Sequence, residues 1–81
     1  MPTNVEKQLL LFLNNHNDGQ YRSEDLLFAH FMELHSAEYI DNQHIVRDAI
    51  DRCIKNNYIA HDSYPEYFIH ITEKGRKIIM E

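Results

Sequence analysis

The chain has 81 residues, a formal net charge of −5 and a sequence pI near 5.6, with 43% hydrophobic and 26% charged residues. This length predicts one domain over residues 1–81, and the composition excludes a disordered or low-complexity chain. The single cysteine, Cys53, excludes an internal disulfide and a cysteine-rich zinc site, so we expect a reducing, cytoplasmic location. The apolar run at residues 9–13 is far shorter than the roughly 20 residues of a membrane span, and the polar start does not resemble a signal peptide.

The first periodic segment predicts a helix over residues 3–15, capped by Thr3 or Asn4. Its main apolar face holds Val5, Leu9, Phe12, Leu13 and His16. Leu10 and Leu11 point elsewhere, so apolar side chains surround most of the middle of this helix, which is typical of burial on more than one side. We predict that Leu10 and Leu11 form a homodimer interface; the alternative is that they are scattered surface residues.

A break at residues 14–19 and a short extended segment at 20–22 precede the second helix. Ser23 is expected to cap this helix, with Glu24 and Asp25 in its first turn and an end near residues 35–36. Its buried face is predicted to contain Leu26, Leu27, His30, Phe31 and Leu34. Residues 37–40 form a connection in which Tyr39 and Ile40 turn toward the core.

A third helix is predicted over residues 42–56, with Asp41 as its cap. It has the strongest periodic signal in the chain, an apolar stripe of Val46, Ala49, Ile50, Cys53 and Ile54. Strands are expected at residues 58–61 and 67–71, joined by a turn at 62–66. Thr72 then caps a short helix over residues 73–80, whose Ile78 and Ile79 fold back on the core. The predicted class is α+β, mostly α.

Two stretches of this pattern resemble the winged helix-turn-helix superfamily. Residues 46–59 (VRDAIDRCIKNNYI) resemble its third helix running into the first wing strand. Residues 68–79 (FIHITEKGRKII) resemble the second wing strand followed by the Leu-Thr-x-Lys-Gly turn of small prokaryotic, archaeal or phage-type regulators. The resemblance covers nearly the whole chain and implies a three-helix core, a β-hairpin wing and a short C-terminal helix.

The resemblance also implies a sequence-specific transcriptional regulator that binds double-stranded DNA, with the third helix in the major groove. Carried over by position, the base-reading candidates are Asn42, Gln43, His44, Arg47 and Asp51. The candidates for phosphate contacts are Arg22, Ser23, Arg52 and Lys55. A homodimer would double these contacts, and a basic cluster in the last helix, Lys74, Arg76 and Lys77, would add to them if it faces the same way.

The charge pattern favours a different hypothesis, an acidic protein-binding winged-helix module that does not bind DNA. The wing at residues 58–71 has no lysine or arginine but has Asp62 and Glu66, and the charges of the third helix nearly balance. The acids of the second helix, Glu24, Asp25, Glu33 and Glu38, form either a solvated face or a patch for a basic protein partner. At the wing tip, Tyr64, Pro65 and Tyr67 either stiffen the turn or contact a protein.

No motif in the sequence carries catalytic chemistry, so we expect neither an enzyme nor a cofactor. The six histidines are His16, His30, His35, His44, His61 and His70. Their spacings do not match a zinc site, so structural or surface roles are the main interpretation, with metal binding and pH sensing as alternatives. Cys53 lies on the apolar stripe, where a buried and inert thiol is expected. There is no Gly-rich phosphate loop and no Gly-x-Ser-x-Gly sequence.

Overall fold

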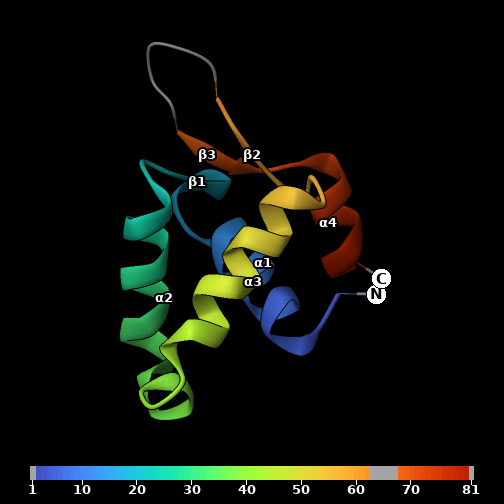
Figure 1. Ribbon diagram of the computed structural model, residues 1–81. Helices are drawn as coiled ribbons and strands as arrows, with labels where there is room; N and C mark the ends of the chain where they lie inside the picture. Colours follow the sequence, from blue (N-terminus) through green and yellow to red (C-terminus); the bar gives the residue numbers. More distant parts are fainter. Residues whose placement is uncertain (1, 63–67, 81) are drawn as a thin grey trace.

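The computed structural model describes residues 2–62 and 68–80, which form four α-helices and a three-stranded antiparallel sheet (Figure 1). This confirms the predicted α+β, mostly helical class. The elements in chain order are α1 (Asn4–Asn15), the 3-10 turn η1 (Asn17–Gly19), β1 (Gln20–Tyr21), α2 (Glu24–Tyr39), α3 (Gln43–Lys55), β2 (Ile59–His61), β3 (Ile69–Ile71) and α4 (Glu73–Met80). The sheet lies at one end of the helices, and α3 crosses in front of α1 in Figure 1.

α1 is the central helix and contacts α2, α3 and α4. Thr3 caps it as predicted, its hydroxyl accepting a hydrogen bond from the N–H of Glu6 (3.3 Å). Leu10 is completely buried in the core, so the prediction that it belongs to a dimer interface is wrong. Leu10 lies one turn before Asn14, whose side chain accepts a hydrogen bond from Arg76 of α4 (3.5 Å), so α4 covers this face. Leu11 stays 44% exposed.

α2 is longer than predicted and continues to Tyr39 through a distortion at His35 (φ −117°, ψ 23°). The extension is held because the Tyr39 hydroxyl donates a hydrogen bond to the Gln8 side chain of α1 (2.8 Å). Ser23 caps the helix as predicted, accepting from the N–H of Leu26 (3.1 Å). Ile40, however, is exposed and does not turn toward the core.

The buried face of α2 also differs from the prediction, because Leu34 is 65% exposed. Leu27 and Phe31 are fully buried as expected, but Met32 is buried in place of Leu34. α3 packs against the side of α2 that contains Asp25 and Phe28, where Arg47 contacts both, and Met32 lies one turn after Phe28 on this side. Leu34 is therefore left at the outer edge of the contact with α1.

α3 confirms the predicted apolar stripe, in which Val46, Ala49, Ile50 and Cys53 are buried and Ile54 packs partly against the core. The cap residue is Asn42 rather than Asp41, and its side chain makes no capping hydrogen bond. None of the helices in the described part of the chain combines the length and apolar character needed to cross a membrane.

The strands form a sheet in the order β1-β3-β2, so the short segment predicted as extended at residues 20–22 is a strand at the edge of the sheet. Tyr21 pairs with Ile69, and Ile59 pairs with Ile71. The predicted roles of Tyr64, Pro65 and Tyr67 in the turn lie outside the described residues.

Thr72 joins the sheet to α4. Its hydroxyl accepts a hydrogen bond from the N–H of Gly75 (3.0 Å), as expected of a cap, and donates to the carbonyl of Asn57 (2.6 Å). Ile78 and Ile79 pack partly buried against the core, as predicted.

We expect Gly75→Ala to lower the free energy of unfolding by about 1–3 kcal/mol, the usual effect of overpacking. A Cβ at this position would overlap the carbonyl oxygen of Tyr58, a backbone atom that does not move aside easily. Urea denaturation measures the effect. Lys77→Ala, at an exposed position of the same helix, is the control and should stay within about 0.5 kcal/mol of wild type. Equal stability of Gly75→Ala and wild type would contradict this close approach.

We expect Cys53 to be unreactive in the folded protein. Its burial, and secondarily the negative charge of Glu6, raises the pKa of the thiol to about 12, so almost no nucleophilic thiolate exists near pH 8. A colorimetric disulfide reagent should label the native chain far more slowly than the same chain in concentrated urea. Equal labelling rates in the two conditions would show that the core around α3 opens readily.

Candidate macromolecule-binding surface

The polar face of α3 is open to solvent along the helix, and it contains most of the predicted site residues. They lie in adjacent rows, because residues three or four apart share a helix face. The exposed residues of the predicted site on this helix and its cap are Asn42, Gln43, His44, Arg47, Asp51, Arg52 and Lys55. Arg22 and Ser23 are also exposed and lie just before α2.

Arg47 is exposed, but its guanidinium group is engaged by α2. Its Nη1 donates a hydrogen bond to Asp25 Oδ1 (2.7 Å), and its side chain remains 51% exposed. The guanidinium also lies 4.0 Å from the centre of the Phe28 ring, a cation–π contact. A base or phosphate would have to compete with both partners for this arginine.

Arg52 is held by a carboxylate on α1. Its Nε donates to Glu6 Oε1 (2.5 Å), and this hydrogen bond is the main cause that raises the pKa of Arg52. The Glu6 side chain is only 4% exposed, whereas that of Arg52 is 44% exposed. A buried carboxylate needs a compensating partner, and Arg52 is that partner for Glu6. Its guanidinium group is therefore already engaged within the chain and is not free to bind a phosphate.

The other phosphate candidates differ in their surroundings. The hydroxyl of Ser23 already accepts the capping hydrogen bond of α2. Arg22 lines a hollow of about 320 Å³ beside the edge strand β1, together with Leu26 and Phe68. Lys55 is exposed at the end of α3, and no ion pair involves it within residues 2–62 and 68–80.

The polar face of α3 is therefore acidic once the ion pairs are taken into account. Asp25 and Glu6 pair with its two arginines, which leaves Lys55 as the remaining cation of α3 against Asp41, Asp48 and Asp51. From the basic cluster of α4, Lys74 reaches the end of α3 and donates a hydrogen bond to the carbonyl of Asn56 (3.0 Å). The described parts of the neighbouring strands add no lysine or arginine. The phosphate backbone of a nucleic acid is bound mainly through cations, and few cations of this surface are without an ion-pair partner.

Three of the histidines contact single carboxylates. The Nε2 atom of His61 lies 3.2 Å from Glu24, and the Nδ1 atom of His70 lies 2.7 Å from Asp62. His35 Nδ1 lies 3.2 Å from Glu38. Across the described ranges, no three histidine, cysteine or acidic side chains come together as a metal site would require.

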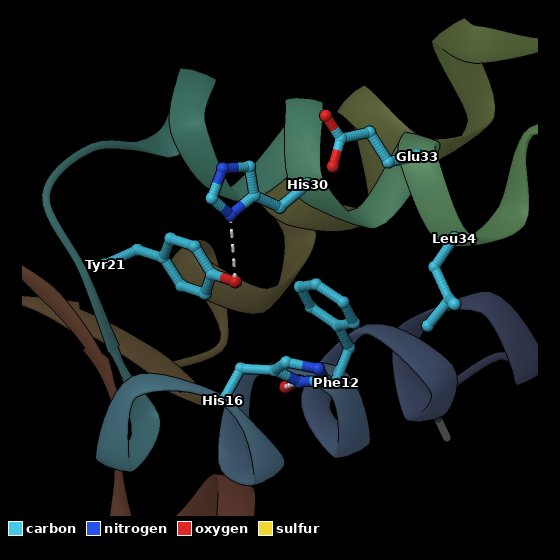
Figure 2. Close-up of a pocket in the computed structure, with 6 residues that line it drawn as sticks. All are labelled: Phe12, His16, Tyr21, His30, Glu33 and Leu34. Carbon is cyan, nitrogen blue, oxygen red and sulfur yellow. Dashed lines mark hydrogen bonds between the residues drawn. The ribbon is translucent and has the colours of Figure 1, made fainter.

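A second surface, which the sequence did not predict, is a groove between α1 and α2 (Figure 2). It consists of two hollows of about 270 and 230 Å³ that share Phe12, His16 and Leu34. The sequence placed all three on buried helix faces. Aromatic residues and histidines alternate on these two helix faces, and this pattern could have pointed to the groove. Only the orientation of α2 in the structure shows that the groove is open to solvent.

Comparison with protein-family models, with curated proteins and with solved structures finds no match to this chain.

We expect Arg52→Ala to lower the free energy of unfolding by about 1–3 kcal/mol, because it leaves the Glu6 carboxylate buried without its partner. Arg47→Ala is the matched control. It removes a pair whose side chains are both largely exposed, and it should cost about 1 kcal/mol or less. Urea denaturation of both variants measures the difference.

Adding Glu6→Gln to Arg52→Ala should restore part of the lost stability, since it removes the unpaired charge. A loss no greater for Arg52→Ala than for Arg47→Ala would mean that the Glu6–Arg52 pair is not structurally important.

Proposed function

We propose that this chain is a winged helix-turn-helix domain that binds a protein partner and does not read DNA through α3. The order of elements supports the fold assignment: three helices, then an antiparallel pair of strands at the position of a wing, then a short last helix. The strand β1 pairs with β3 beside them, which is consistent with this fold.

One observation carries the functional proposal: both arginines of the exposed α3 face form ion pairs within the chain. Arg47 pairs with Asp25 and Arg52 with Glu6, while Asp48 and Asp51 face solvent. Non-specific affinity for DNA comes from cations that displace counterions from phosphates. A protein surface has no such requirement, and an acidic face suits a basic partner.

The second candidate is a homodimeric transcriptional regulator that reads double-stranded DNA with α3. The open polar face of this helix favours it, because Gln43 and His44 at its start are exposed and have hydrogen-bonding groups suited to base edges. In this candidate the dimer contact through α1 would depend on Leu11, since Leu10 is buried.

Selection from a random duplex pool, followed by fluorescence anisotropy at physiological salt, distinguishes the two candidates. We expect no enriched motif and a Kd no tighter than about 10⁻⁴ M, the weak end of non-specific binding. The double variant Asp48→Asn, Asp51→Asn is the informative control, because it removes two negative charges from the exposed polar face of α3.

An enriched site bound at least about 10³-fold more tightly than random duplex would overturn the proposal. In that case Arg47→Ala should cost about 1–3 kcal/mol at one base position. The neutralised double variant should then bind more tightly than wild type.

A further inference from the structure

The groove between α1 and α2 lies away from the polar face of α3. In Figure 2 the side chains of Phe12 from α1 and of His16, which follows the end of α1, lie across from those of His30 and Leu34 from α2. On α2, Leu34 lies about two and a half turns after Asp25, the residue that contacts α3, so the two side chains are on opposite faces of the helix. A ligand in the groove would therefore not touch the ion pair of Arg47.

The floor of the groove is aromatic and rigid. The ring of His16 stacks on that of Phe12, with 4.2 Å between centroids, and its Nδ1 donates to the Phe12 carbonyl (2.7 Å). At one end, the Tyr21 hydroxyl lies 3.3 Å from His30 Nδ1. These contacts hold the side chains in place without a ligand, so little ordering is needed on binding.

Two exposed leucines lie along the groove, one on each helix. Leu34 is 65% exposed and lines both hollows, and Leu11 is 44% exposed and lines the second. Apolar side chains beside an aromatic hollow are typical of the centre of a protein interface, where a single inserted side chain supplies much of the affinity.

The charges around the groove are negative. Glu33 lines the first hollow, and Glu38 lies at the other end, next to His35. Among residues 2–62 and 68–80, no lysine or arginine lines either hollow; Lys7, one turn before Leu11 on α1, lies outside both linings. Burial, and to a smaller extent the negative charge of Glu33, raises the pKa of the Tyr21 hydroxyl, and both residues line the first hollow.

We propose that this groove docks a segment of a partner protein that presents an apolar side chain next to a lysine or arginine. The inference rests on the proposed protein-binding function and identifies its site and the chemistry of its partner. The apolar side chain enters between Phe12 and Leu34, and the cation lies against Glu33.

A symmetric contact between two copies does not satisfy these groups. In a two-fold contact the same face appears on both sides, so Glu33 and Glu38 could pair only with groups of this same face. The described residues that line the groove include no lysine or arginine that could act as the partner of these carboxylates. α4 of a second copy, with exposed Met80 near Lys77, would fit only as an open head-to-tail contact, which the experiment below tests.

The probe is a random 12-residue peptide library displayed on phage, selected at pH 7.5 on the full chain. We expect the enriched peptides to share an apolar residue adjacent to, or one helical turn from, a lysine or arginine. Synthetic copies should bind with an affinity that falls as salt increases, because an exposed charge pair is screened.

Two variants locate the site. Leu34→Glu should weaken peptide binding at least about tenfold, the effect of losing a central interface side chain. Glu33→Lys should reverse the charge preference toward acidic peptides. Ile40→Glu is the matched control, since Ile40 is a similarly exposed apolar residue at the C-cap of α2 and outside the groove, and it should leave binding unchanged. Circular dichroism verifies that all three variants fold.

Amide chemical-shift changes separate the possible failures. Changes around His16, Glu33 and Leu34 support the proposal. Changes around Gln43 and Arg47 would overturn the groove assignment while leaving a protein-binding function intact. Enrichment of peptides without a cation, or no enrichment, would overturn the proposal itself. Self-association in sedimentation that both Leu34→Glu and Met80→Ala abolish would show that α4 of a second copy is the occupant, which also overturns it.

Discussion

The structure depends on the burial of α1, a helix with apolar side chains on nearly all sides. A helix of this kind is stable in water only when other elements cover each face. α2 and α3 cover part of it, and α4 returns from the sheet to cover the face that includes Leu10. The need to bury this helix therefore determines where the last helix lies, and it leaves Leu11 and Leu34 uncovered along one edge.

The packing of the helices also determines which charged side chains form ion pairs. Because α3 crosses α1, Arg52 comes within reach of Glu6, and the buried carboxylate obtains its partner. Because α3 also packs beside the start of α2, Arg47 meets Asp25 and the ring of Phe28. The two arginines that the sequence predicted as DNA ligands therefore form ion pairs between helices. The exposed face of α3 then has more acidic than unpaired basic side chains.

The two surfaces differ in how far the sequence predicted them. The polar face of α3 was predictable, because a strong apolar stripe identifies the opposite face. The ion pairs of its two arginines were not predictable, because Asp25 is 22 residues from Arg47 and Glu6 is 46 residues from Arg52 along the chain. The groove was missed because periodicity placed Leu34 on the same face as Leu27 and Phe31. Periodicity does not predict which side of α2 packs against α3, and so it could not show that Met32 is buried while Leu34 is exposed.

By itself, the sequence determined the helices, three of the four caps, the pairing of strands near the C-terminus and the mostly helical α+β class. These features depend on side chains a few residues apart, and the spacing of such residues is given directly by the sequence. Tertiary structure alone decided that Leu10 is core, that α2 continues to Tyr39, which arginines are free, and which edge of α1 stays open. Those outcomes depend on contacts between residues far apart in the chain, and local periodicity contains no information about which of several apolar faces a later helix will cover.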